Sequence, residues 1–307
     1  MWINQLHLRV DIIRRRRRPR KSILGTVLSV LVVAGCASTT PYVGQGPHRQ
    51  VTRGAAIPPV DFIGNVLSVP AKVILWNRHF NNHYISAATE ARLTRFLDAR
   101  DRPAFKQTIY RLNQYTPIAD LRALIKNHYV AWPYRLLLGF PLTLISDVLL
   151  PGRLFPWGDY YNPYTNTAHL YSDDPAIAIH EAGHAYDFAD FPYKGTYATL
   201  RLVPFMDLYQ EWRATDEAIG YFIENGDREM EFHAYRTLWP AYGTYVGSYI
   251  PAPFSSIIGA VLGHVAGRSK VVARQHYYKR MDAVLGRSPQ RPEARTTAIH
   301  SGKEEKE

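Results

Sequence analysis

The chain has a single cysteine, no internal repeat and no long uninterrupted apolar run. Because Cys36 has no second thiol in the chain to pair with, the protein contains no intrachain disulfide, even in an oxidising compartment. The absence of a repeat at a fixed period excludes solenoids and propellers. With 46% hydrophobic and 21% charged residues among 307, the composition is that of a globular protein, which excludes a disordered, collagen-like or coiled-coil chain.

The net charge of +11 is concentrated near the N-terminus. Residues 1–35 carry eight basic residues against one acidic residue, a net charge of +7, which leaves +4 for the remainder. A basic chain is a candidate for nucleic-acid binding only where the positive charge lies on the folded body. Because the excess belongs mostly to the N-terminal segment, we expect no nucleic-acid partner.

The first 36 residues have the layout of a bacterial secretion signal. A basic segment comes first, and the apolar run over residues 23–33 that follows is too short to span a bilayer comfortably. The run ends in Val33-Ala34-Gly35-Cys36, which resembles a lipobox, the site where lipoprotein processing lipidates the cysteine sulfur and cleaves just before it. The resemblance implies lipidation at Cys36, and an uncleaved N-terminal anchor is the alternative.

The lipobox resemblance also implies a location. In sorted lipoproteins the residue after the lipidated cysteine determines the membrane to which the protein is delivered. Ala37 at this position, rather than an aspartate, favours the outer membrane over the inner one. We therefore expect the body to be lipid-anchored to the bacterial cell envelope and to face the periplasm. The membrane is then a partner of the protein through the lipid at Cys36.

Composition divides the chain into four parts. Residues 1–35 are the predicted signal peptide, and residues 36–59 are rich in Thr, Gly, Pro and Gln, which is typical of a flexible tether. Residues 287–307 hold two prolines, many charges and almost no large apolar residue, so we expect a disordered tail. The folded domain is predicted over residues 60–286.

Helices and strands are both predicted in this folded part, which indicates an α+β fold. Ser86 is a suitable cap for a helix over 86–98, and a strand is predicted over 107–115. A threonine cap followed by proline at the first helical position predicts a second helix over 116–127.

Two stretches are unusually apolar. Residues 130–150 are interrupted by two prolines, a glycine and two charged residues, so we expect broken core or membrane-facing segments rather than a spanning helix. In residues 250–267, Gly259, Gly263 and Gly267 recur every four residues. This spacing favours tight packing of one helix on another, with membrane insertion as the alternative.

The most informative segment contains His180-Glu181-Ala182-Gly183-His184, an H-E-x-x-H motif. The motif lies on a helix predicted over 175–189, directly after a strand predicted over 165–171. Histidines four residues apart project from one face of a helix, so both imidazoles can reach a single Zn²⁺ at about 2.0–2.1 Å. Glu181 can then take a proton from water held beside the ion.

Zinc needs a third protein ligand, and three acidic residues are candidates. Asp190 follows the second histidine by six residues, as in the metzincin pattern, but Asp187 occupies the position where a glycine would let the chain turn. Glu211 lies on a helix predicted over 204–224, on a face of small residues that permits close helix packing. Glu217 lies on another face of that helix. We favour Glu211, with the other two as alternatives.

Here the chain resembles the gluzincins, zinc metallopeptidases that carry H-E-x-x-H on one helix and a glutamate ligand on the next. The glutamate is often part of an E-x-x-A-D word, and residues 211–216 read E-W-R-A-T-D. The words match at Glu211 and Ala214, whereas Asp216 is one residue late. The resemblance covers about residues 160–220.

The resemblance implies a zincin-like metallopeptidase domain within the α+β class, with a small sheet and a mostly helical C-terminal part. It implies one Zn²⁺ bound by His180, His184 and Glu211, with Glu181 as the catalytic residue. The expected activity is hydrolysis of peptide bonds in a peptide or protein substrate. The alternative is a catalytically inactive zincin-like lipoprotein that acts as a binding or envelope-assembly module.

The resemblance also implies supporting residues. Asp216, or Asp187 one turn beyond the second histidine, would orient a ligand histidine. The strand before the motif helix would be a sheet edge that pairs with substrate through Asn166, Ala168 and Leu170. Zincins use a downstream side chain to stabilise the oxyanion. The candidates for this role are Tyr242, Tyr245, His233 and His264.

Overall fold

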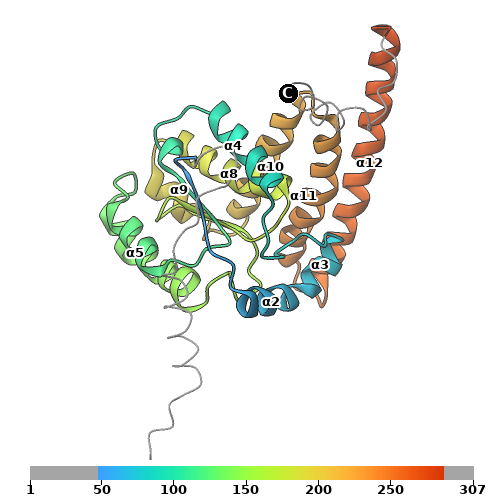
Figure 1. Cartoon of the computed structure of the whole chain (residues 1–307). Helices are drawn as coiled ribbons and strands as arrows, with labels where there is room; N and C mark the ends of the chain where they lie inside the picture. Colours follow the sequence, from blue (N-terminus) through green and yellow to red (C-terminus); the bar gives the residue numbers. More distant parts are fainter. Residues whose placement is uncertain (1–47, 287–307) are drawn as a thin grey trace, which may run out of the picture.

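The fold places a small four-stranded sheet beside a set of helices that extends well past it (Figure 1). The structure is a computed structural model, and it describes residues 48–286. The predicted signal peptide, the predicted lipidation site Cys36 and the predicted tail over 287–307 lie outside the described residues.

The described chain alternates short strands with helices in its first half and is helical thereafter, which confirms the α+β class. The strands are β1 (Val51–Arg53), β2 (Ile109–Leu112), β3 (Tyr160–Asn162) and β4 (Thr167–Leu170). The helices of the first half are α2 (Pro58–Leu67), α3 (Val69–Leu75), α4 (Ala87–Ala99), α5 (Pro117–Lys126), α6 (Trp132–Tyr134) and α7 (Phe140–Thr143). Those of the second half are α8 (Pro175–Asp190), α9 (Lys194–Leu200), α10 (Met206–Glu224), α11 (Arg228–Ser248) and α12 (Ser255–Val284).

The sheet is mixed, with the strand order β1-β2-β4-β3. Strand β2 pairs in parallel with both β1 and β4, and β3 pairs antiparallel with β4. The strand that precedes the motif helix is therefore internal, and the prediction of an edge strand there is wrong. Ala168 and Leu170 face the core and are almost fully buried, so they cannot pair with a substrate.

The tight turn before β4 explains this difference. Asn166 adopts a left-handed conformation with φ of 52°, which asparagine tolerates, and the turn brings β3 back alongside β4. The Asn166 side chain accepts hydrogen bonds from Thr108 Oγ1 (2.8 Å) and the Tyr161 hydroxyl (2.7 Å). The Asn166 side chain therefore stabilises the turn and is not available to bind a substrate.

The folded region begins earlier than predicted. Residues 51–53, within the predicted tether, form β1 and pair with the edge of β2. Just before β1, the buried Gln50 side chain donates hydrogen bonds to the carbonyl oxygens of Phe105 (2.7 Å) and Thr108 (3.2 Å). Backbone pairing and one buried amide order a segment whose composition is polar, which composition alone does not reveal.

Two local predictions are confirmed. The Ser86 hydroxyl accepts a hydrogen bond from the Thr89 amide (3.3 Å) and caps α4. Helix α5 begins at Pro117 and ends at Lys126, within one residue of the predicted bounds.

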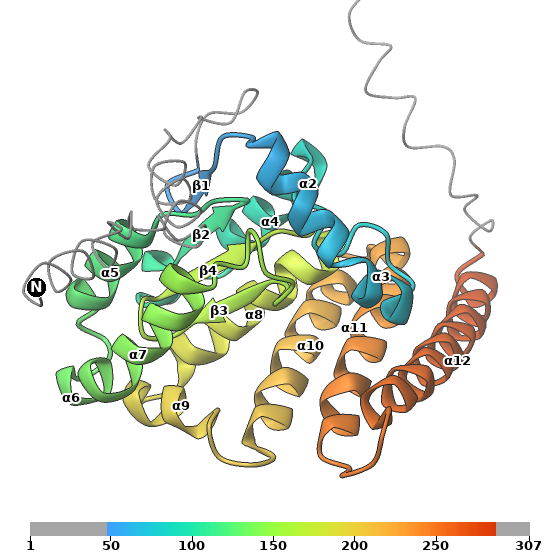
Figure 2. The ribbon, with the colours of Figure 1, turned by 90° about the horizontal axis from the view of Figure 1, so that it is seen from below.

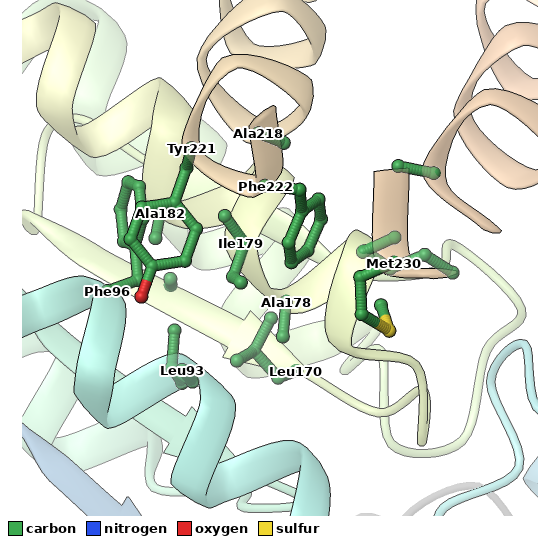
Figure 3. Close-up of a cluster of buried hydrophobic side chains, with 14 of the residues drawn as sticks. Leu93, Phe96, Leu170, Ala178, Ile179, Ala182, Ala218, Tyr221, Phe222 and Met230 are labelled. Carbon is green, nitrogen blue, oxygen red and sulfur yellow. The ribbon is translucent and has the colours of Figure 1, made fainter. Parts of the chain in front are cut away.

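Helix α8 is the centre of the core (Figure 3). Ala178, Ile179 and Ala182 on this helix pack among residues of β4, α4 and α10. The partners drawn in Figure 3 are Leu93, Phe96, Leu170, Ala218, Tyr221, Phe222 and Met230. Because α8 is buried nearly all round, each polar side chain on it requires a partner within the fold.

The prediction of broken segments over 130–150 is wrong: residues 132–149 keep helical backbone angles throughout, and only the hydrogen-bond pattern changes along them. Helices α6 and α7 alternate with two π-helical stretches, η2 (Arg135–Gly139) and η3 (Leu144–Leu149). Within residues 48–286, no helix combines the length and the apolar character needed to cross a membrane.

Helices α11 and α12 form an extended hairpin, as Figures 1 and 2 both show. Gly243 of α11 faces Gly259 of α12 so closely that a methyl group on either would overlap the carbonyl oxygen of the other. Gly263 and Gly267 pack in the same way against the α11 backbone. The predicted helix packing at the four-residue glycine spacing is confirmed.

We expect Gly243→Ala to lower the free energy of unfolding by about 1–3 kcal/mol, because the added methyl must force the two helices apart. Gly220→Ala is the matched control, since a methyl there meets nothing within 4 Å. That change should stabilise the protein by about 0.5–1 kcal/mol through helix propensity alone. Urea unfolding measures both, and equal stabilities of the parent and Gly243→Ala would contradict the packing.

Candidate metal centre

The start of α8 is defined by its cap. The Asp174 carboxylate accepts a hydrogen bond from the Ala176 amide (2.9 Å), and Pro175 occupies the first helical position. From this start, His180 and His184 project one turn apart on the same side, with ring centroids 4.7 Å apart. Both imidazoles are buried, so the motif lies inside the fold.

Helix α10 approaches α8 at its smallest residues. A methyl group on Gly183 would lie only 2.9 Å from the Ala214 carbonyl oxygen, so the backbones are in near contact. Ala214 and Ala218 on α10 are fully buried. This close approach, predicted from the small residues on α10, brings Glu211 beside the two histidines.

Three donor atoms converge between the helices. The Glu211 carboxylate lies 3.1 Å from Nε2 of His180 through Oε2 and 3.4 Å from Nε2 of His184 through Oε1. All three side chains are buried, and their donor atoms lie within 4.8 Å of one another. Of the residues that the structure describes, only these three form a group able to hold a metal ion.

The two alternative ligands lie elsewhere. Asp190 is exposed and forms an ion pair with Arg102 (2.9 Å). Glu217 forms an ion pair with Arg100 (2.7 Å). Both carboxylates are therefore paired outside the cluster, which leaves Glu211 as the acidic member.

The charge states of the cluster suit a divalent ion. Burial acts to raise the pKa of Glu211, but His184, Arg201 and His180 outweigh it and hold this pKa well below its usual range. Burial lowers the pKa of His184 to about 4, so that imidazole is neutral at pH 7. Burial acts to lower the pKa of His180, but the hydrogen bond and charge of Glu211 outweigh it and raise this pKa, so a metal ion that binds there would displace a proton. An ionised carboxylate and neutral imidazoles are the donors that Zn²⁺ takes. The three residues thus fit a zinc ion.

A threonine orients the first histidine. Oγ1 of Thr215 lies 3.3 Å from Nδ1 of His180, which leaves Nε2 to face Glu211. Thr215 occupies the aspartate position of the E-x-x-A-D word. Asp216 is exposed on the outer side of α10, since one further residue rotates a side chain by about 100° around the helix. The supporting role predicted for Asp216 is wrong.

The role predicted for Asp187 is also wrong. Its carboxylate accepts hydrogen bonds from the Tyr197 hydroxyl (2.9 Å) and from Nε of Arg213 (3.0 Å). Both oxygens are engaged, one with α9 and one with α10. Asp187 therefore connects the three helices around the cluster rather than orienting a ligand histidine.

Arg201, just after α9, is a residue of the site that the sequence does not reveal. Its Nη2 donates a hydrogen bond to Oε1 of Glu211 (2.6 Å). The guanidinium holds the carboxylate in one orientation and leaves Oε2 opposite His180. No motif marks Arg201, because its place depends on how α9 packs.

A cavity of about 300 Å³ opens beside the cluster and is lined by His180, Glu181 and Glu211. Burial raises the pKa of Glu181 to about 8. Most of the wall is apolar and comes from α3, α8 and α11. Its apolar members include Ala71, Ile74, Leu75, Phe80, Ile177 and Leu238.

The four candidates for oxyanion stabilisation divide into two pairs. Tyr242 and Tyr245, on α11, line the cavity, and the nearby Glu211 carboxylate raises the pKa of Tyr245. His233 instead contacts both oxygens of Asp174 (2.9 Å). His264 contacts the Ile74 carbonyl oxygen (2.9 Å). Both tyrosines are placed to contact a ligand in the cavity.

The chain matches no protein-family model, no curated protein and no solved structure. The site is therefore interpreted from its own geometry and chemistry.

We expect Thr215→Val to weaken zinc binding by about 10- to 100-fold, because the isosteric side chain no longer orients His180. Competition with a chelator of known affinity measures the change. Thr215→Ser keeps the hydroxyl and is the control. Equal zinc affinity of Thr215→Val and the parent would rule out the orienting role.

The His233 pair with Asp174 predicts a pH-dependent stability. Burial lowers the pKa of His233, but the hydrogen bond and charge of Asp174 outweigh it and raise the pKa above 6.5. The stabilisation is therefore complete below pH 6.5 and is lost as the pH rises through the raised value.

His233→Gln should then lower the melting temperature more at pH 5.5 than at pH 9. The loss is about 1 kcal/mol or less, because the imidazole is 42% exposed and solvent screens the pair. Thermal unfolding across this range measures the difference, with the exposed His276→Gln as the control. A loss that is the same at both pH values would contradict the charge pairing.

Proposed function

We propose that the protein is a zinc-dependent metallopeptidase of the gluzincin type. The observation that carries the proposal is the convergence of His180, His184 and Glu211 from two helices beside a cavity that Glu181 also lines. A structural zinc site has no need of a carboxylate next to its first ligand, whereas hydrolysis needs a proton carrier there. This combination favours catalysis over a structural site.

In the proposed hydrolysis, the metal ion and the protein side chains have different roles. Bound by His180, His184 and Glu211, zinc would supply a Lewis acid that polarises the scissile carbonyl and acidifies water. Arg201 holds Glu211 through Oε1, and Thr215 holds His180 through Nδ1, so the ligand side chains are oriented before an ion binds.

Glu181 moves the proton. Burial favours the protonated form of Glu181, and the charge of a bound Zn²⁺ would favour the ionised form. In that ionised form its carboxylate, in the wall of the cavity, would accept a proton from the attacking water and deliver it to the nitrogen of the leaving amine. The buried, largely apolar surroundings exclude bulk water, which strengthens each electrostatic interaction within the cavity.

Tyr245 is the group that we assign to the developing oxyanion. The Glu211 carboxylate and burial raise the pKa of Tyr245, so its hydroxyl stays protonated and donates a hydrogen bond. It lines the same cavity as Glu181, from the opposite helix α11.

Substrate has to approach by a route other than β4, which is internal. The residues that lead into β3, from Pro156 to Asp159, form one wall of the cavity. We therefore propose that a peptide or protein substrate enters between this segment and α3.

For the location we propose the bacterial cell envelope. The N-terminal pattern supports a chain that is lipid-anchored at Cys36 and faces the periplasm, with the outer membrane favoured. The small excess of positive charge outside this segment supports the absence of a nucleic-acid partner.

The test is Glu181→Gln, which keeps the shape of the side chain and removes the proton acceptor. We expect full zinc content and a loss of peptide hydrolysis of at least about 100-fold. Elemental mass spectrometry measures the zinc, and mass spectrometry of a synthetic peptide mixture measures the cleavage. Glu217→Gln, a carboxylate outside the cluster, is the matched control.

Each outcome separates the alternatives. Equal cleavage by the parent and Glu181→Gln would overturn the mechanism. A parent that binds zinc but cleaves nothing would favour a catalytically inactive zincin-like lipoprotein that acts as a binding or envelope-assembly module. A parent that binds no zinc would overturn the peptidase proposal and leave the inactive module in a metal-free form.

A further inference from the structure

A second hollow lies next to the cavity of the metal centre. Its volume is about 620 Å³, and α3, α11 and α12 form its walls. Leu75, Asn77 and Thr237 line both spaces, so the two lie side by side at the end of α3. Figures 1 and 2 show these three helices close together on one side of the molecule. We refer to this second hollow as the basic groove.

The lining of the basic groove is cationic. Lys72, Arg78, Arg236 and Arg268 line it together with two histidines, and no Asp or Glu is among its lining residues. Within residues 48–286, none of these four cations lies within 4.0 Å of a carboxylate, whereas ten other arginines form ion pairs. The positive charge of the groove is thus uncompensated.

The polar contacts of these cations are with neutral groups. The Lys72 ammonium donates to the Asn65 carbonyl oxygen (2.9 Å), and Nε of Arg78 donates to the ring of His79 (3.1 Å). Nη1 of Arg268 contacts Nδ1 of His264, one turn earlier on α12 (2.8 Å). Each keeps its charge available to a ligand.

The nearest buried acid does not neutralise the groove. Asp174 already contacts Nε2 of His233 (2.9 Å), Nδ2 of Asn77 (2.7 Å) and the amide of Ala176 (2.9 Å). These contacts occupy both of its oxygens at the start of α8. Asp174 therefore caps α8 and pairs with His233.

Trp76 holds part of the groove in place. It ends α3 in a left-handed conformation (φ of 50°) and stacks on His264, with ring centroids 4.2 Å apart. The Arg268 guanidinium lies over the same indole, 4.6 Å from its centroid. Arg268 is thus oriented in advance, which reduces the entropy lost when it binds an anion.

We propose that the basic groove binds acidic side chains of the substrate whose scissile bond lies at the metal centre. This inference rests on the proposed function. Extended peptide advances about 3.3 Å per residue, so one segment reaches from the apolar cavity past Leu75 into the groove. The substrate class is a polypeptide with an apolar residue at the scissile bond and Asp or Glu a few residues away.

The adjacency of the two hollows favours a peptide over an anionic membrane surface. The groove and the cavity share three lining residues, so one extended chain that passes Leu75 would contact both. Lys72 and Arg268 are half-buried in the wall, where a narrow ligand that enters the groove would meet them, whereas Arg78 and Arg236 are exposed.

The test measures binding without turnover. Zinc-loaded full-length Glu181→Gln protein is titrated with two labelled peptides that share an apolar centre and carry either two glutamates or two glutamines on each side. Fluorescence anisotropy gives both affinities. Because exposed ion pairs contribute little each, we expect the glutamate peptide to bind about tenfold tighter at low salt. The preference should shrink at about 0.5 M salt through screening.

The charge-reversed variant Arg78→Glu/Arg236→Glu, made in the same background, should bring the ratio of the two affinities to about one or below. Arg122→Glu on α5 is the control, because it reverses an exposed arginine outside the groove and should keep the tenfold ratio. An unchanged ratio in Arg78→Glu/Arg236→Glu would overturn the proposal. The proposal would also be overturned if neither protein preferred the glutamate peptide and Arg78→Glu/Arg236→Glu instead lost binding to anionic phospholipid vesicles.

The groove proposal and the peptidase proposal can fail independently of each other. A glutamate preference that depends on Arg78 and Arg236, in a parent protein that cleaves no peptide, would retain the groove as a peptide-binding site and reject the hydrolysis. Cleavage of both peptides at equal rates, with equal affinities, would retain the peptidase and reject the groove.

Discussion

The burial of α8 is the constraint on which the site depends. A helix surrounded by β4, α4 and α10 carries two histidines and a glutamate, and polar groups in such surroundings are costly unless they have partners. Helix α10 supplies the partners of the two histidines through Glu211 and Thr215, and it can do so because Gly183 and Ala214 allow the two backbones into near contact. The same packing that stabilises the core therefore assembles the donor atoms.

Around this pair of helices, a second layer of contacts limits how the ligands can move. Asp187 connects α8 to α9 and α10, and Arg201, just beyond α9, donates a hydrogen bond to Oε1 of Glu211. Helices α3 and α11 then form the cavity wall over the cluster. Helix α3 has two sides, one facing the apolar cavity and the other the basic groove, so its position affects both the chemistry and the proposed recognition of substrate.

Predictions from sequence succeeded where the pattern is local. The cap at Ser86, the start of α5 at Pro117 and the glycine spacing on α12 all depend on neighbours within a turn or two of helix. The predictions failed where pairing with a segment far away in the sequence determines the structure. The strand at β4 is internal because the turn at Asn166 adds β3 to its edge, and residues 51–53 are ordered because β2 offers them an edge.

By itself, the sequence determined the α+β class, the helix that carries His180, Glu181 and His184, and the acidic residue on a later helix that best completes the group. Helical periodicity and side-chain chemistry suffice for these, since a residue's face on a helix depends only on its position. The tertiary structure alone decided that Thr215 rather than Asp216 contacts His180, that Arg201 holds Glu211, and that four unpaired cations share one groove. These relations join segments far apart in the chain, and their geometry exists only once the helices have packed.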